Sequence, residues 1–304
     1  MRTRQLLLAL LCPLMVAAES RQLLSPDGRL AVNIRVDRGL ATYSVSYDGR
    51  DMLLPSRLGL RSDIGDFTQG LRLAEVRESA VEKSYDMTRT KASRSDFKAT
   101  RAELTIENGD RHRVVVTFLV GNHDVAFRYT LLRQENDNPK SAVVTGEATS
   151  FRLPEGTTTF ISPQSSPMIG WERTKPSYEE VYSADAAMSE RSQYGQGYVF
   201  PALFHVPAAG GAGKEAVDGW VLVSETGVTG AYVGSHLSDY DARTGYTIAY
   251  PMAGELNGLG SAAAGIAVPG STPWRTITVG NTLAPIVETT VSFDVVEPLY
   301  EPSE

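Results

Sequence analysis

One stretch near the end of the chain reads Thr272-Pro273-Trp274-Arg275-Thr276-Ile277-Thr278-Val279-Gly280. β-Branched and aromatic side chains dominate it, and such residues favour the pleated, half-buried surface of a β-strand. Comparable stretches recur along most of the 304 residues, with turn residues between them. Because many short strands separated by turns are typical of sheet-on-sheet folds, the sequence predicts a large antiparallel sandwich.

Alternation of apolar and polar residues marks the first strands of this sandwich. Leu30, Val32, Ile34 and Val36 alternate with other residues, and the pattern resumes at Tyr43 after a turn at Asp37-Arg38-Gly39. A period of two is what a half-buried strand requires. Six further strands are predicted at Arg113–Leu119, Ala126–Leu131, Trp220–Val223, Tyr246–Tyr250, Arg275–Val279 and Thr290–Val295.

Helix signals are scarce by comparison. Ser177-Tyr178-Glu179-Glu180 has the spacing of a capping box, which predicts a short helix that ends before Gly195. Two stretches rich in small residues, Pro207–Gly213 and Gly254–Gly270, read as loops. Strands do not alternate with helices as they do around a parallel sheet, so the chain reads as a single all-β domain.

The N-terminus has the composition of a secretory signal. Arg2 and Arg4 precede an apolar run, and small residues before position 19 offer a cleavage site after Ala18. We therefore expect a signal peptide over residues 1–18 and one mature domain over 19–304. The apolar run is too short to span a bilayer, so we expect no membrane segment after signal cleavage and a periplasmic or secreted protein.

Charge and cysteine content exclude several classes of function. The formal net charge is −7, and losing Arg2 and Arg4 makes it −9. Nucleic-acid binding needs a basic face, so we expect no nucleic-acid partner. Cys12, the one cysteine, lies in the signal. The mature chain then has no disulfides, no thiolate catalysis and no cysteine-bound zinc.

Several blocks of the sequence, taken in order, carry a family resemblance. They are Ser25–Gly28, Tyr43–Gly49, Pro55–Leu60, Val125–Tyr129, Glu147–Phe151, Trp171, Tyr178–Tyr182, Gly219–Glu225 and Thr272–Gly280. Each block alone is ordinary strand and turn chemistry. Their order and spacing together resemble the N-terminal domain of glycoside hydrolase family 97, over nearly the whole mature chain.

The resemblance implies a β-super-sandwich of the galactose-mutarotase-like type. In the family this domain packs on a catalytic (β/α)8 barrel that cleaves α-glucosides or α-galactosides. The barrel carries the general acid and either a base or a nucleophile, all of them carboxylates. This sequence contains no counterpart of the barrel, so we expect no hydrolysis by the chain as it stands.

The resemblance also implies a calcium ion in the active site. Most of its ligands come from the barrel, and one glutamate comes from the N-terminal domain at the position of Glu225. The chain departs from the family pattern after this residue, since Tyr232 is displaced by one position. Calcium takes six to eight oxygen ligands, so Glu225 cannot hold it tightly alone. The alternative is a glutamate that faces solvent at a strand end.

Candidate sugar contacts are aromatic residues in the segment that faces the barrel in the family. Trp171 and Tyr178 are the predicted substrate-binding residues, because aromatic rings stack on sugars. Packing in the core or at an interface is an alternative for both. Glu179 and Glu180 are adjacent and point differently, so they are expected to cap the helix or line a rim.

We therefore expect a carbohydrate-binding accessory domain of a calcium-dependent exo-acting α-glycoside hydrolase, with carbohydrate and a barrel domain in cis or in trans as partners. A stand-alone carbohydrate-binding module, a mutarotase-like sugar epimerase and a purely structural partner are the alternatives.

An epimerase would use a histidine acid with a carboxylate base. The histidines, which carry no motif and are expected to be exposed or structural, are His112, His123, His205 and His236.

Overall fold

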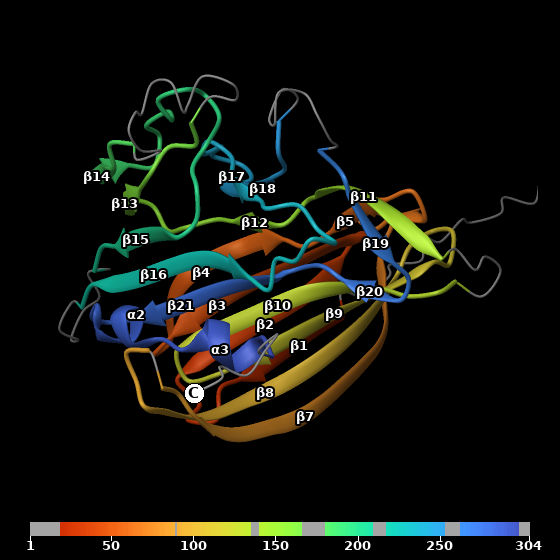
Figure 1. Cartoon of the computed structure of the whole chain (residues 1–304), viewed down its shortest axis with the longest axis horizontal. Coiled ribbons are helices and arrows are strands. Elements are labelled where there is room, and N and C mark those ends of the chain that lie inside the picture. Colours follow the sequence, from red (N-terminus) through yellow and green to blue (C-terminus); the bar gives the residue numbers. More distant parts are fainter. Residues whose placement is uncertain are drawn as a thin grey trace, which may run out of the picture.

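The computed structural model describes residues 19–88, 90–134, 140–165, 180–208, 217–252 and 262–297. Over these residues the chain is built almost entirely from antiparallel strands, and the two helices found among them are five residues long (Figure 1). The predicted all-β antiparallel sandwich is confirmed.

The first sheet is a four-stranded meander at the N-terminus. Its neighbouring strands are β1 (Glu19–Leu24), β2 (Leu30–Asp37), β3 (Leu40–Tyr47) and β4 (Arg50–Arg57). The β2–β3 turn places Arg38 and Gly39 at φ values of 50° and 76°. Glycine adopts that left-handed conformation without steric penalty, which is why the predicted turn falls there.

The largest sheet has ten strands and contains the central strand of the fold. Nine strands form a continuous order: β14 (Ser183–Ala187), β13 (Thr158–Ile161), β15 (Ala202–Val206), β16 (Gly219–Thr226), β21 (Trp274–Gly280), β10 (Asp124–Leu131), β9 (Arg113–Val120), β8 (Arg94–Glu107) and β7 (Arg72–Asp86). The tenth, β20 (Gly270–Ser271), pairs with the end of β10. The stretch Thr272–Gly280 therefore supplies a central strand, β21, between β16 and β10.

Two smaller sheets complete the fold. One runs β19 (Ala264–Ala267), β11 (Ser141–Glu147), β5 (Leu60–Ser62) and β6 (Gly65–Asp66). The other runs β12 (Ser150–Phe151), β18 (Tyr246–Ala249) and β17 (His236–Leu237). Tyr43 Oη donates to the carbonyl oxygen of Ser150 at 3.0 Å, which ties the first sheet to β12.

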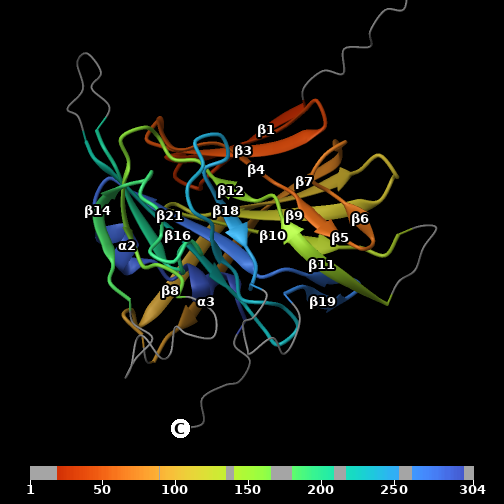
Figure 2. The same cartoon turned by 90° about the horizontal axis from the view of Figure 1, so that it is seen from above.

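The two faces of the large sheet are covered differently. Sheet β1–β4 packs on one face, while α2 (Ala284–Glu288) and α3 (Val291–Val295) lie against the other (Figures 1 and 2). Rings of Tyr43, Phe118 and Phe127 meet in the first interface, with Tyr43 and Phe127 centroids 5.1 Å apart. The main core therefore lies between the sheets, and the helical side has only a small apolar cluster.

Most predicted strands are confirmed, including those in β2, β3, β9, β10, β16, β18 and β21. The strand predicted at Thr290–Val295 is wrong, because Val291–Val295 forms helix α3. Asp294 explains the difference: its backbone N–H and its carboxylate both bond back to Thr290, while Tyr85 and Ser95 donate to the same carboxylate. These tertiary contacts outweigh the β propensity of the valines.

Two other local predictions need correction. Residues 177–179 lie outside the described residues, but from Glu180 to Gly195 the chain contains strand β14 and turns instead of the expected helix. Strand β14 forms because β13 offers an edge, with Thr158 paired to Ala187. The predicted loop Gly254–Gly270 is described only from residue 262, and there Ala264–Ala267 pairs with β11 as strand β19.

Candidate functional site

A buried arginine at the centre of the large sheet organises the candidate site. Arg275 lies on β21 opposite Phe127 of β10 and Glu225 of β16. Side chains alternate along a strand, so Arg275 points to the same inner face as Ile277 and Val279. Its side chain is 0 % exposed. A guanidinium buried this deeply requires charged partners.

Glu147, at the end of β11, is the first partner. Arg275 Nη2 donates to Glu147 Oε1 at 2.5 Å, and Arg275 Nε donates to Oε2 at 3.3 Å. The side chain of Glu147 is also 0 % exposed. The contact is therefore a buried, two-pronged ion pair that joins β21 to the β19–β11–β5–β6 sheet.

Glu225, near the end of β16, is the second partner. Its Oε2 accepts hydrogen bonds from Arg275 Nη1 and, at 2.7 Å, from Ser235 Oγ. Its Oε1 accepts one bond, from the Ser235 backbone N–H at 3.0 Å. The side chain is 11 % exposed. Glu225 is thus nearly buried, and Oε1 keeps a lone pair that no described residue uses.

Two tyrosines close the cluster on its other side. Tyr232 and Tyr250 share a short hydroxyl–hydroxyl hydrogen bond, and their hydroxyls lie 3.4 and 3.5 Å from Glu147 Oε1. The pKa of each tyrosine is raised above the ordinary tyrosine value. Burial is the larger cause, and the negative charge of Glu147 is the second. Both hydroxyls therefore stay neutral at physiological pH.

The charges of this cluster do not balance. Burial alone would lower the pKa of Arg275, but Glu147 and Glu225 outweigh that effect and raise it, so the arginine is cationic. One guanidinium faces two carboxylates. The remaining negative charge in a site of low polarity favours an additional cation beside Glu225.

Calcium fits this donor set only in part. The free lone pair of Glu225 is a carboxylate oxygen, which is the ligand type that calcium prefers. The described residues hold no group of three or more His, Cys, Asp or Glu side chains arranged to bind a metal ion. The chain could therefore supply one calcium ligand, and the others would have to come from elsewhere.

The sequence-predicted residues meet different outcomes. Glu225 belongs to a buried ion-pair network, so the alternative of a strand-end glutamate open to solvent does not describe it. Trp171 and Tyr178 lie outside the described residues. Glu180 is described, and its Oε2 accepts a hydrogen bond from Tyr194 at 3.0 Å.

Sequence reasoning missed Glu147 and Arg275 as site residues, although both lie in stretches that it singled out. Arg275 is the single charged residue in an otherwise apolar and hydroxyl-bearing strand. An isolated charge in a central strand predicts a buried partner, and that signal could have identified Arg275. Glu147 carried no such signal, because its partner is 128 residues away.

Three of the four histidines have structural surroundings. His123 Nδ1 lies 3.1 Å from the Val279 carbonyl oxygen, and its ring is 5.3 Å from that of Tyr47. His205 contacts Asp218 at 3.3 Å and packs against Trp220. His236 is buried in β17.

Within the described residues, no helix is long and apolar enough to cross a membrane.

The family model described as glycosyl-hydrolase 97 N-terminal matches residues 23–298. A crystal structure of a β-arabinopyranosidase is 49% identical and has a TM-score of 0.85, with the match covering 93% of this chain and 44% of that one.

Two further relatives are more distant. A probable retaining α-galactosidase from Streptomyces bingchenggensis (strain BCW-1) is 26% identical over 270 residues, covering 89% of this chain and 36% of the relative. A family 97 enzyme from Pseudoalteromonas sp. strain K8, solved with panose, is 18% identical with a TM-score of 0.71, covering 91% and 38%. The chain therefore spans less than half the length of these relatives.

Proposed function

The chain belongs to the glycosyl-hydrolase 97 N-terminal family, and we propose that it is the carbohydrate-binding accessory domain of an exo-acting glycoside hydrolase. It acts with a catalytic (β/α)8 barrel, in cis or in trans, and forms part of the wall of the sugar site. The observation that carries the proposal is the buried cluster of Arg275, Glu147 and Glu225. Its uncompensated negative charge supports a cation beside Glu225.

Glu225 is the calcium ligand in this proposal. Arg275 and Ser235 hold its carboxylate and leave one lone pair on Oε1 for the metal. Calcium bound there would neutralise the surplus charge, and it would supply a positive centre near the sugar. One carboxylate from this chain gives weak binding by itself, and the barrel provides the remaining oxygen ligands.

A terbium titration tests the calcium proposal on this chain. Terbium occupies calcium sites, and its luminescence is excited by nearby tyrosines such as Tyr232 and Tyr250. We expect a luminescence increase that calcium reverses at millimolar concentration, and at least a tenfold weaker response in Glu225→Gln. Glu78→Gln, an exposed change on β7, is the control. An equal response in wild type and Glu225→Gln, with both variants folded by circular dichroism, would remove Glu225 from the metal site.

The relatives also suggest the substrate class. The β-arabinopyranosidase is 49% identical to this chain, whereas the probable α-galactosidase is 26% identical. Arabinopyranose lacks the exocyclic hydroxymethyl group that galactopyranose carries. We expect the enzyme that contains this domain to prefer the pentopyranoside, because the relative with the higher identity is a β-arabinopyranosidase.

Hydrolysis of matched chromogenic glycosides distinguishes these substrates. The enzyme isolated from the producing cells should cleave a nitrophenyl arabinopyranoside with a higher kcat/KM than the corresponding galactoside. A higher kcat/KM for the galactoside would overturn the substrate assignment and leave the accessory role intact. Binding of either free sugar by this chain alone, without calcium, would favour the stand-alone carbohydrate-binding module.

Export is the remaining part of the proposal, and it rests on the basic and apolar composition of residues 1–18. N-terminal sequencing of the natural protein should begin at Glu19. A mature protein that begins at Met1 would contradict export through this signal.

A further inference from the structure

Three arginines line a hollow at one end of the large sheet, where β8 is followed by β9. Arg72 begins β7, Arg111 lies in the turn between β8 and β9, and Arg113 begins β9. The hollow has a volume of about 490 Å³ and shares no residue with the Glu225 cluster. Its other lining residues are Gly70, Glu107, Asn108 and Gly109. The chain as a whole has a formal net charge of −7, so a group of arginines around one hollow indicates a local preference for an anion.

Glu107 fixes two of these arginines in place. Its Oε1 accepts a hydrogen bond from Arg72 Nε at 3.0 Å, and its Oε2 accepts one from Arg113 Nε at 2.9 Å. The Glu107 side chain is 3% exposed, whereas those of Arg72 and Arg113 are 59% and 48% exposed. Hydrogen bonds from Arg113 and Arg72 lower the pKa of Glu107, so it is ionised. The carboxylate therefore lies beneath two guanidinium groups that remain open to solvent and are oriented before a ligand arrives.

The third arginine is held by an unusual turn. Arg111 has a φ of 65°, in the left-handed region that residues other than glycine rarely adopt. Asn108 maintains this turn, because its carbonyl oxygen accepts from the Arg111 N–H at 3.0 Å and its Oδ1 accepts from the N–H groups of Asp110 and His112. A strained backbone that its neighbours hold in place is a common feature of binding sites.

Glycines leave room at the bottom of the hollow. A Cβ on Gly109 would meet nothing within 4 Å, and a Cβ on Gly70 would have the Gly109 backbone nitrogen as its nearest neighbour, at 4.0 Å. The Gly109 N–H has no hydrogen-bond acceptor among the described residues. A concavity that contains an unpaired backbone N–H suits a ligand oxygen that carries negative charge.

Positive charge is in excess around the hollow. Three guanidinium groups and one carboxylate line it. Counting the exposed carboxylate of Asp110, which belongs to the same turn, gives three positive and two negative charges and still leaves one positive charge in excess. The hollow therefore favours an anion over a neutral sugar.

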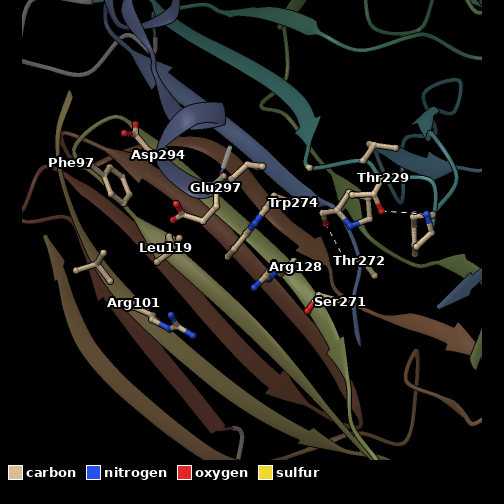
Figure 3. A pocket seen from close by; sticks show the side chains of 18 of the residues that line it. Phe97, Arg101, Leu119, Arg128, Thr229, Ser271, Thr272, Trp274, Asp294 and Glu297 are labelled. Carbon is tan, nitrogen blue, oxygen red and sulfur yellow. Dashed lines mark hydrogen bonds between the residues drawn. The ribbon is translucent and has the colours of Figure 1, made fainter. Parts of the chain in front are cut away.

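Two other arginines of the large sheet are stabilised within the chain. Arg275 is buried between two carboxylates, and the guanidinium carbon of Arg128 lies 4.3 Å from the centroid of the Trp274 ring (Figure 3). Among the described residues, Arg111 has neither a carboxylate nor an aromatic ring as a partner. Its charge is therefore available to a ligand.

We propose that this hollow binds a tetrahedral oxyanion, a sulfate or phosphate group, between Arg72, Arg111 and Arg113. Guanidinium groups match such oxygens with paired, charge-assisted hydrogen bonds. Three of them supply more donors than the two oxygens of a carboxylate need, which favours the tetrahedral anion. A free ion and the sulfate or phosphate ester of an acidic polysaccharide share this chemistry. The proposal goes beyond the accessory role and does not depend on it.

A sulfate titration tests the site on the chain itself. Sodium sulfate replaces sodium chloride at constant ionic strength, so general screening does not change. The arginine Nε–H resonances of ¹⁵N-labelled protein are followed, and that of Arg111 is identified by its absence in Arg111→Met. We expect a saturating shift of this resonance with a dissociation constant on the order of 1 mM, and about tenfold weaker binding in Arg113→Met. Arg94→Met, which removes an exposed arginine at the opposite end of the β7–β8 hairpin, should bind as wild type.

Dextran sulfate and neutral dextran then identify the source of the anion. Binding of dextran sulfate at least tenfold more tightly per sulfate group than free sulfate would support the site and identify a polysaccharide ester as the ligand. Equal affinity per sulfate group would support the site as one for the free ion. Neutral dextran should leave the Arg111 resonance unchanged.

Three results would overturn the proposal. These are no shift of the Arg111 resonance up to about 50 mM sulfate, an equal shift with acetate at the same ionic strength, or unchanged sulfate binding by a folded Arg113→Met variant. A shift with neutral dextran as large as that with dextran sulfate would also contradict it, because the charge would then play no part. None of these results bears on the calcium role of Glu225, since the two sites share no residue.

Discussion

At the scale of single residues, two arginines of the large sheet differ in the groups that stabilise their positive charge. Arg275 is fully buried between Glu147 and Glu225, whereas Arg128 stacks on Trp274 without a carboxylate among the described residues. The first serves the internal architecture and holds the proposed calcium ligand.

Replacing Arg275 measures how much this cluster contributes to the free energy of unfolding. Arg275→Met leaves two buried carboxylates without a cation, and breaking a buried pair in this way costs about 3–5 kcal/mol. Urea unfolding followed by tryptophan fluorescence measures the loss. Arg61→Met removes an exposed partner of Asp66 and should cost less than about 1 kcal/mol. Similar losses in the two variants would contradict the central role of Arg275.

Asp124, a half-buried carboxylate at the start of β10, makes a prediction about pH. Burial raises the pKa of Asp124, and the charge of Asp294 adds to the effect, although Thr278, Thr289 and His123 oppose it. The folded protein therefore binds this proton more tightly than the unfolded chain does. The resulting stabilisation is complete below the unfolded pKa of about 3.9 and is lost as pH rises through the raised folded pKa.

Asp124→Asn should remove this dependence, because an amide oxygen can still accept from the hydroxyls of Thr278 and Thr289. The melting temperature of the variant relative to wild type should increase between pH 4 and pH 7. A difference that stays constant, or falls, over this range would show that Asp124 is fully ionised without penalty in the folded protein.

At the scale of elements, the sequence predicts strands well wherever alternation is regular. In β3 the buried residues Ala41, Tyr43, Val45 and Tyr47 alternate with less buried ones, as a period of two requires. The prediction failed at Thr290–Val295, because long-range hydrogen bonds to Asp294 decide that segment. The Glu147–Arg275 ion pair could not be predicted either, because its two residues are far apart in the sequence. Only the packing of the sheets brings them together.

Helix α3 should depend on Asp294 accordingly. Asp294→Ala removes the acceptor for Tyr85, Ser95 and Thr290 and leaves their hydroxyls without this partner. Each such loss at a buried hydroxyl costs about 1–3 kcal/mol. Hydrogen exchange should show faster exchange at residues 291–295, with little change in β2 and β3. Unchanged protection of α3 would mean that valine packing alone maintains the helix.

At the scale of the whole molecule, one sheet has a closed and an open face. Sheet β1–β4 and the helices α2 and α3 lie on opposite sides of the large sheet (Figure 2). The inner face holds the main core and the charged cluster, while on the outer face Arg128 stacks on Trp274. The resemblance in sequence led to the correct family and fold. It could not reveal the stacking of Arg128 on Trp274, because the two residues come from separate strands.

Exposed apolar side chains on α2 and α3 should make the isolated chain associate with itself. Val287 on α2 and Phe293 on α3 are 66% and 46% exposed. Static light scattering of wild type should therefore show a mass that rises with concentration, and Val287→Ser should reduce that rise. Val217→Ser, an exposed valine outside this face, is the control. A concentration-independent monomer in wild type would contradict association through these exposed side chains.

The most direct test of the accessory role is native immunoprecipitation of the protein from the producing cells, followed by mass spectrometry. We expect peptides of a (β/α)8 glycosidase barrel at one copy per copy of this domain, either in the same polypeptide or in a bound partner. Recovery of this 33.0 kDa chain as a monomer, without any barrel, would contradict the accessory role.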